Sequence, residues 1–570
     1  MRKLKNKQKF QGALSASLLF LSSIAIAVPA TVTAEDFSAR KEREANFPKA
    51  RAQFGKADID LPEGGSGMME QFKKVKLHFA GTKGEITGAT QYSQDELQGY
   101  FSELTGNEIT LDKVYEAANA IELRYKNDGF VLARVVIPAQ TISDGRVKVM
   151  VYEGFIDKVT VNAPGNIRDV IKGFADKLTS YNPINIEQLE RYLLLINDLP
   201  GVKAKSILRP GAKSGSTEIV VRTEQNRFAG TASVNNYGTE FVGPGLVSVS
   251  GTTNSLFDWG EQFTVELTGT LPKAEEYNSR RFAFSLPMGS EGFRMDLEYL
   301  SVDSDPGYTL SELLALSDTE KFAIQAYYPT IRSRMHNLSF TAGYDHRNAS
   351  TEILNAPFQD DRVRSVHIGG VYDWADAMDG INLVALTVTQ GIPSGSATKR
   401  GDTLSSRPES TPAFTRLNLE ASRLQSLQSM VENLSFYTAL AVQMADEPLY
   451  SSEEFSIGGR EFGRGYNLGD IAGDRGLAVK AELQYTATLP KESSVQLYGF
   501  FDYGKIWNVD SVDRGTIRET DSLASSGAGL RFNLTKYVAI ELEMAKPLTK
   551  TPTTFDEKDP RYFGQMKLSF

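Results

Sequence analysis

Residues 477–489, LAVKAELQYTATL, alternate between apolar and polar side chains along their length. Successive side chains of a β-strand point to opposite faces of its sheet, so this alternation predicts a strand with two different faces. One face would carry Leu477, Val479, Ala481, Leu483, Tyr485, Ala487 and Leu489, and the other Ala478, Lys480, Glu482, Gln484, Thr486 and Thr488. Such a strand fits a membrane barrel with lipid outside and a polar lumen inside, and it equally fits a half-exposed soluble sheet.

The same pattern recurs from Arg227 to Phe570, where helical periodicity is absent. We count 16 short alternating strands there, and bacterial single-chain membrane barrels have an even number. The sequence therefore predicts a transmembrane barrel of 16 antiparallel strands over residues 227–570. The strands are expected to begin near Arg227, Leu246, Gln262, Arg280, Gly292, Thr319, His336, Val363, Ile381, Phe414, Asn433, Leu477, Val495, Leu523, Val538 and Pro560.

The connections between these strands support the membrane alternative. After the first strand they alternate between long and short, as in outer-membrane barrels, whose long loops face outside the cell. A soluble β-sandwich has no reason to alternate its loop lengths in this way. The long connections are expected at 303–318, 347–362, 392–413, 446–476 and 507–522, and short ones at 257–260, 288–291 and 491–494.

Residues 72–224 have a different organisation, in which strand and helix patterns alternate twice. We predict two small α+β domains of the order β-α-α-β-β, at 72–154 and 155–224. In the first, Ser93 and Glu96 have the spacing of a helix-capping box. A second helix is expected over 111–126, with Val114, Ala118, Ile121 and Tyr125 on one face.

The first 34 residues have the features of a secretory signal peptide. A positive start is followed by an apolar stretch at 13–28 and by the small residues of a cleavage site ending at Ala34. The alternative is a membrane anchor that is retained. Residues 35–71 form a polar N-terminal segment and linker, in which a short helix would be interrupted by Pro48.

Composition excludes several classes of function. The chain has no cysteine, so disulfides and thiolate metal sites are impossible, and its net charge of −9 gives no basic footprint for nucleic acid. Mean hydropathy is −0.29, and no apolar run after residue 34 is long enough for a membrane helix. Phosphate-binding loops, zinc-protease motifs and nucleophile elbows are missing, and the four histidines are scattered. We therefore expect no catalytic residues, no cofactor and no metal.

Several short motifs follow one another in a fixed order. They are Gly129-Phe130, Ile137-Pro138-Ala139-Gln140, Asp144-Gly145-Arg146, Tyr152-Glu153-Gly154, Leu199-Pro200-Gly201-Val202, Gly458-Gly459-Arg460-Glu461-Phe462-Gly463-Arg464-Gly465-Tyr466 and Phe500-Phe501-Asp502-Tyr503-Gly504. Together with the strand count, they resemble the motifs of two-partner secretion transporters, the haemolysin and adhesin secretion-activation proteins. Members of this family carry POTRA domains in front of an outer-membrane β-barrel.

The resemblance implies a function and a set of site residues. The two α+β domains would be periplasmic POTRA domains that capture an unfolded partner exoprotein, which then crosses the outer membrane through the barrel without ATP. The long loop would fold into the lumen, where Arg464, Gly465 and Tyr466 meet Asp502 and Gly504. Terminal Phe570 would be the signal for the barrel assembly machinery. From spacing alone, Arg464 and Asp502 would be interpreted as an ordinary loop charge and an ordinary lumen acid, and the resemblance reverses this interpretation.

Two other functions stay open at this point. A barrel-insertion factor of the same superfamily would use the first and last strands as a lateral seam, although such factors usually carry more POTRA units. A porin or receptor would leave residues 72–224 without a role. The sequence does not identify the cargo, which could be an adhesin, a haemolysin, a contact-dependent toxin or a haem-binding protein.

Overall fold

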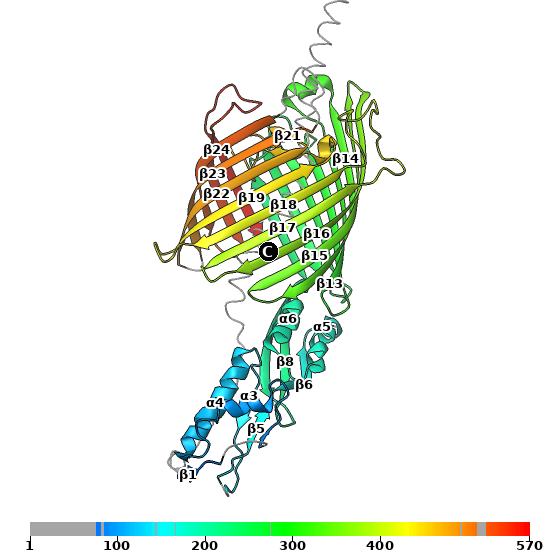
Figure 1. The fold of residues 1–570 in the computed structure, drawn as a ribbon. Coiled ribbons are helices and arrows are strands. Elements are labelled where there is room, and N and C mark those ends of the chain that lie inside the picture. The colour runs from blue at the N-terminus through cyan, green and yellow to red at the C-terminus, as the bar shows by residue number, and fades with distance from the viewer. Residues whose placement is uncertain are drawn as a thin grey trace, which may run out of the picture.

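The computed structural model describes residues 76–570, except for 81–84, 143–144, 166, 274, 491–492 and 510–519. The predicted signal peptide at 1–34 and the N-terminal segment at 35–71 lie outside the described residues. Two small α+β units are stacked below a wide barrel (Figure 1). None of the helices in the described part of the chain is long and apolar enough to span a membrane.

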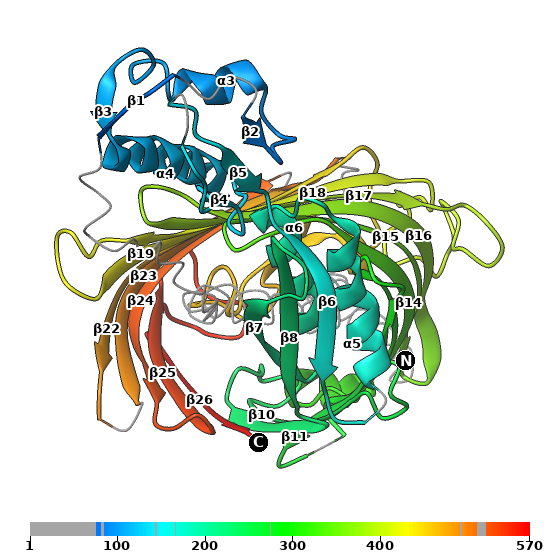
Figure 2. The same cartoon turned by 90° about the horizontal axis from the view of Figure 1, so that it is seen from below.

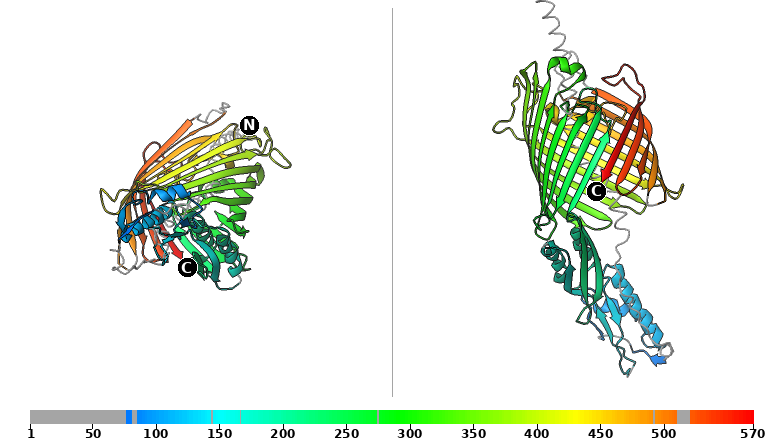
Figure 3. Two further views of the ribbon diagram at one scale, coloured as in Figure 1. Left: turned by 60° about the horizontal axis from the view of Figure 1, so that its bottom comes forward. Right: turned by 180° about the vertical axis from the view of Figure 1, so that it is seen from behind.

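The barrel is closed and contains the 16 antiparallel strands that the sequence predicts. Each strand pairs with its neighbour in the chain, and β26 pairs with β9 over five residues to complete the ring. Figure 3 shows this seam from behind. The strands are β9 (Phe228–Asn235), β10 (Gly245–Asn254), β11 (Gln262–Leu271), β12 (Asn278–Met288), β13 (Phe293–Ser304), β14 (Leu316–Arg332), β15 (His336–Ile353), β16 (Ala356–Ala375), β17 (Gly380–Gly391), β18 (Thr415–Ser426), β19 (Leu434–Ala445), β22 (Arg475–Thr488), β23 (Ser494–Trp507), β24 (Thr520–Asn533), β25 (Val538–Pro547) and β26 (Arg561–Ser569).

One predicted connection is wrong. Residues 347–362 do not form a long loop, because β15 and β16 continue through this segment and are joined by Leu354 and Asn355 alone. Both residues have positive φ, which suits the twist of a two-residue hairpin turn. The polar side chains that suggested a loop belong to a hairpin that extends beyond the other strands.

The first α+β unit has the two predicted helices but two additional strands. It contains β1 (Lys76–His78), β2 (Ile86–Thr87), α3 (Gln94–Gly99), β3 (Glu108–Thr110), α4 (Leu111–Asn127), β4 (Arg134–Val136) and β5 (Val149–Tyr152). Its sheet has the order β2-β5-β4, whereas the predicted first strand, β1, pairs with β3 instead. The two-residue strand β2 is too short to show an alternating pattern, which explains why the sequence did not reveal it.

Local signals in this unit are confirmed. Ser93 and Glu96 form the expected capping box at the start of α3. The predicted apolar face of α4 is buried in the core of the unit, where Val114, Ala118, Ile121 and Tyr125 are at most 2% exposed. The helix buries this face against the sheet because an amphipathic helix gains its stability from packing.

The second unit has the predicted order of elements. It contains β6 (Phe155–Asn162), α5 (Ile167–Asp176), the short 3-10 helix η2 (Lys177–Ser180), α6 (Ile186–Asn197), β7 (Val202–Pro210) and β8 (Ser216–Gln225). Its sheet has the order β6-β8-β7, with both helices packed on one face. Seen from below, this unit lies under part of the barrel opening (Figure 2).

Hydrogen bonds and an ion pair join α6, and the residue that follows it, to the end of β14 at this side of the barrel. Arg191 donates to the carbonyl oxygens of Pro329 and Thr330, each at 3.0 Å. Arg332 donates two hydrogen bonds of 2.7 Å to the carboxylate of Asp198. A fork-to-fork pair of this kind fixes orientation as well as distance. The second unit is therefore held against one side of the opening.

Candidate functional site

The connection between β19 and β22 folds back into the barrel instead of extending outward. We call residues 446–474 the inward hairpin. It contains the short 3-10 helix η4 (Ser451–Glu453) and two short strands, β20 (Phe455–Ile457) and β21 (Ile471–Gly473), which pair with each other. Its apolar side chains form a buried cluster with wall residues of β19, β22, β23 and β24.

Two glycines in the wall let the inward hairpin approach closely. A Cβ atom at Gly504 would lie 2.5 Å from Ile457 of β20, and one at Gly476 would lie 2.0 Å from Phe455. Neither distance is possible for a real side chain, so only glycine allows β20 to pack this closely against the wall. Gly504 was predicted as a site residue, and the reason for glycine at this position is the contact with β20.

Arg464 and Asp502 meet at the tip of the inward hairpin, which we define as residues 458–467. The guanidinium of Arg464 donates two hydrogen bonds to the carboxylate of Asp502 on β23, from Nε at 2.9 Å and from Nη2 at 2.7 Å. The backbone N–H groups of Gly463 and Arg464 also donate to Asp502. Arg464 is 3% exposed and Asp502 is fully buried, so the contact is closed to bulk water.

Arg464 has two further acidic partners that the sequence did not reveal. Its Nη1 lies 2.6 Å from a carboxylate oxygen of Glu482 on β22 and 3.2 Å from one of Glu543 on β25. The guanidinium also stacks on Phe500, with its carbon 3.4 Å from the ring centroid. One arginine thus joins three strands of the wall, and planar delocalised charge suits this role better than the point charge of a lysine.

Gly465 and Tyr466 complete the tip. A Cβ atom at Gly465 would lie 2.7 Å from the backbone nitrogen of Pro547, so only glycine permits this approach to the end of β25. Tyr466 is buried, and its hydroxyl lies 2.9 Å from Oγ1 of Thr549 and accepts the N–H of that residue. The structure therefore brings Arg464, Gly465, Tyr466, Asp502 and Gly504 together on one side of the lumen.

Phe570, the predicted assembly signal, lies at the seam and not at this site. Its backbone exchanges two hydrogen bonds with Gly230 on β9, at 2.8 and 3.0 Å. A Cβ atom at Gly230 would lie 2.3 Å from the ring, so the ring of Phe570 occupies the space that a side chain would fill. Phe570 thus extends the pairing of β26 with β9, the first strand of the barrel.

Two of the motifs of the α+β units, Gly129-Phe130 and Tyr152-Glu153-Gly154, lie where the two units join. Glu153 is buried and accepts hydrogen bonds from the backbone of Thr90 and Gln91 and from the hydroxyl of Tyr125. Burial acts to raise the pKa of Glu153, but these hydrogen bonds outweigh it and lower the pKa below its usual range. Gly129 accepts the N–H of Ile186 at 2.8 Å, which connects the end of α4 to the start of α6.

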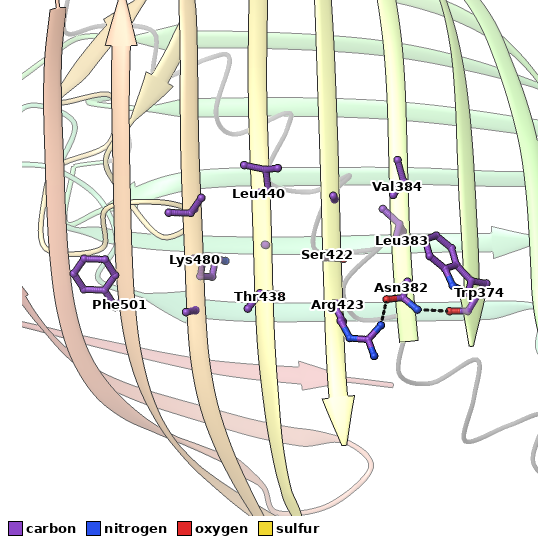
Figure 4. Close-up of a pocket in the computed structure, with 14 residues that line it drawn as sticks. Trp374, Asn382, Leu383, Val384, Ser422, Arg423, Thr438, Leu440, Lys480 and Phe501 are labelled. Carbon is purple, nitrogen blue, oxygen red and sulfur yellow. Dashed lines mark hydrogen bonds between the residues drawn. The ribbon is translucent and has the colours of Figure 1, made fainter. Parts of the chain in front are cut away.

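A hollow of about 480 Å³ lies elsewhere, on the outer face of the barrel (Figure 4). Leu440 and Phe501 line it, and they pair across the strands with Val479 and Ala481. Both partners flank Lys480 on β22 and therefore face the opposite side of the wall. Lys480 pairs with Asp502 and shares its side. Since Asp502 faces the lumen, the hollow faces outward, toward lipid in a membrane. It does not belong to a route through the barrel.

Comparisons with known proteins agree with this architecture. The family model described as haemolysin secretion/activation protein ShlB/FhaC/HecB matches residues 215–532, and the model of the ShlB-type POTRA domain matches residues 79–154. The chain is 26% identical over 465 residues to the heme/hemopexin transporter protein HuxB of Haemophilus influenzae (strain 86-028NP), covering 80% of each chain. It is 22% identical over 467 residues to the hemolysin transporter protein ShlB of Serratia marcescens, covering 81% of this chain and 80% of that protein.

Solved structures share the fold. CdiB from Escherichia coli has a TM-score of 0.74 at 16% identity, covering 95% of this chain and 99% of that chain. BamA from Haemophilus ducreyi lacking POTRA domains 1–3 has a TM-score of 0.51 at 13% identity, covering 87% of this chain and 100% of that chain. These likenesses concern architecture alone.

Proposed function

Because the chain belongs to the haemolysin secretion/activation family ShlB/FhaC/HecB, whose model spans more than half of it, we propose how its residues move a partner through the barrel. The protein is a two-partner secretion transporter of the bacterial outer membrane, with its POTRA region in the periplasm, and it translocates a partner exoprotein. Transport then has three steps: the α+β units capture the partner, the inward hairpin closes the lumen at rest, and the partner passes after the tip is released.

The contact of Arg464 with Asp502 supports the closure of the lumen by the inward hairpin. The inward hairpin lies inside the ring of strands, and its tip is fastened to β22, β23 and β25 by one buried arginine. A resting pore needs a closure, since an open channel would leak small solutes. We assign this closure to the inward hairpin and its release to the tip.

Capture is assigned to the open edges of the two small sheets. In the described residues, β4 ends the sheet of the first unit and β7 ends that of the second. An edge strand presents unpaired N–H and C=O groups, on which an unfolded chain can add itself as a further strand. Backbone pairing makes little demand on sequence, which suits the capture of a long cargo.

No catalysis is assigned to this chain, and the energy for export comes from outside it. Folding of a cargo domain beyond the membrane releases about 5–15 kcal/mol, which biases a diffusing chain outward. Three relatives at 26% identity are named heme/hemopexin transporters, which favours a haem-binding exoprotein as the cargo. The gene beside that of the transporter should encode this partner.

Photo-crosslinking from two exposed positions tests capture. Val136 on the edge strand β4 and Leu123 on α4 are 43% and 58% exposed in the same unit. A photoreactive residue at position 136 should crosslink the N-terminal segment of the co-expressed partner, and the same residue at position 123 should not. Both variants should still secrete the partner, which controls for the function of the transporter. Equal crosslinking from both positions would exclude the edge strand as the capture site.

A further inference from the structure

We propose that the inward hairpin is fastened at a second, separate site and that Arg407 is the positioning residue of this site. We call the site the root and define it as residues 449–454 together with Asp474, where the inward hairpin leaves and rejoins the wall. Arg407 lies on the connection between β17 and β18, at 392–414. The inference rests on the proposal that the inward hairpin closes the lumen.

Arg407 binds both ends of the inward hairpin at once. Its guanidinium donates to both carboxylate oxygens of Asp474, at the end of the hairpin. It also donates to Glu454 at 2.8 Å and to the carbonyl oxygen of Leu449 at 2.9 Å, at the beginning. Asp474 is fully buried and accepts the N–H of Leu449 at 2.7 Å. Arg407 therefore ties the two arms of the hairpin together from a neighbouring surface loop.

Glu453 fastens the root to the wall. Its carboxylate accepts a hydrogen bond of 2.8 Å from Arg416 on β18 and lies 3.5 Å from Arg347 on β15. Backbone contacts strengthen the attachment, since Arg347 donates to the carbonyl oxygen of Ser452 at 2.9 Å and Gln443 on β19 donates to that of Glu453 at 3.0 Å. The adjacent acids Glu453 and Glu454 thus point to different partners, one on the wall and one on the surface loop.

Root and tip use different parts of the barrel. The charged partners of the root come from β15, β18 and the surface loop that carries Arg407, whereas those of Arg464 come from β22, β23 and β25. In these contacts no residue serves both sites. Release of the tip leaves the root in place, so the hairpin swings aside and can return. Loss of the root contacts frees the base of the hairpin instead and thereby weakens the closure of the lumen.

Ion conductance of the purified full-length chain in a planar lipid bilayer tests the inference without a cargo. Arg407→Ala should raise the fraction of time that the channel is open by about tenfold, which corresponds to about 1.4 kcal/mol. The matched control is Arg400→Ala on the same surface loop. Arg400 pairs with Glu447, which belongs to the inward hairpin but lies outside the root, in an exposed ion pair that contributes little. Its open fraction should equal that of the wild type.

A disulfide provides the rescue. Oγ of Ser406 lies 3.0 Å from the backbone nitrogen of Ser451, and the chain has no cysteine of its own. In the Arg407→Ala background, Ser406→Cys with Ser451→Cys should return the open fraction to the wild-type value when oxidised, and a reductant should raise it again. A disulfide that forms and leaves the channel open would overturn the role of the root, as would an unchanged open fraction in Arg407→Ala.

Two comparisons separate this inference from the proposal on which it rests. If Arg464→Ala leaves the conductance unchanged, the closure by the inward hairpin itself is wrong. If Arg464→Ala opens the channel and Arg407→Ala does not, only the root is wrong. Should Arg407→Ala fail to give the heat-modifiable band of a folded barrel, Arg407→Lys carries the test. Lysine keeps the charge but not the fork, so an intermediate open fraction is expected and a wild-type value contradicts the inference.

Discussion

Replacing Arg464 with alanine should release the tip of the inward hairpin from the wall. The substitution removes the shared partner of three carboxylates, those of Asp502, Glu482 and Glu543. These side chains are at most 4% exposed, so the negative charges that remain are poorly hydrated. The closed state loses its favourable contact and gains repulsion, whereas the released state lets water reach the acids.

The size of the effect follows from the number of partners on each side. Removing one member of a buried ion pair typically costs about 3–5 kcal/mol, and water in the lumen moves this toward the lower end. Asp502→Ala leaves Arg464 with Glu482 and Glu543, so its cost should be that of lost charged hydrogen bonds, about 1.5–3 kcal/mol. The arginine variant should therefore be the more open of the two.

A single cysteine beneath the inward hairpin reports the opening. Ala441 on β19 is 2% exposed and packs in the apolar cluster under the hairpin, and the chain has no other cysteine. The rate at which a maleimide labels Ala441→Cys measures the population of the released state. A cost of about 3 kcal/mol corresponds to about 150-fold faster labelling in Arg464→Ala. Denatured protein should label equally fast in all variants, which controls for reactivity.

The double variant decides whether Arg464 and Asp502 act through their contact. If they do, Arg464→Ala with Asp502→Ala should label little faster than Arg464→Ala alone, because the contact can be lost only once. The double variant also has one buried carboxylate fewer than Arg464→Ala. The weaker repulsion likewise keeps its labelling rate close to that of the single variant. Strict additivity of the two effects on the logarithm of the rate would refute the contact as the lock of the tip.

Four further changes test other parts of the structure. Gly465→Val should push the tip away from β25 and raise the labelling of the reporter cysteine, because no Cβ atom fits there; unchanged labelling would contradict the close approach. Arg332→Glu should detach the second unit and Asp198→Arg in the same chain should restore it, as measured by protease cleavage between the unit and the barrel. Glu153, whose pKa is lowered, stabilises the first unit above the unfolded pKa of about 4.3 and loses this effect as the pH falls through the lower folded value, so the hydrogen-exchange protection factors of the α4 amides should fall with acid in the wild type and not in Glu153→Gln. Deleting Phe570 should slow barrel assembly, seen as a delayed heat-modifiable band.

Local patterns along the chain predicted most of the fold. Period-two alternation placed the strands, because each strand separates lipid from lumen through its own side chains. The same logic failed for residues 347–362, where the hairpin of β15 and β16 extends beyond the other strands and its polar side chains no longer mark a loop. It also missed β2, whose two residues join the sheet only because β5 lies beside them.

The site was predictable in part. Resemblance to a family pointed to Arg464 and Asp502, which lie 38 residues apart and meet only because the inward hairpin turns into the lumen. Glu482 and Glu543 were missed, since nothing in the spacing of two lumen-facing acids shows that a loop will reach them. Arg407 was missed for the same reason, because its partners come together only when the barrel closes.

A polypeptide that crosses the membrane through the lumen of this barrel should be found there when its passage is arrested. A photoreactive residue is placed at Gln325, which faces the lumen on β14, or at Phe322, which faces outward on the same strand and is 44% exposed. The partner exoprotein is co-expressed with a disulfide-locked C-terminal domain that arrests it in transit. A crosslink to the arrested partner is expected from position 325 and none from position 322. Crosslinking from position 322 alone would mean that the partner crosses outside the barrel, contrary to transport through the lumen.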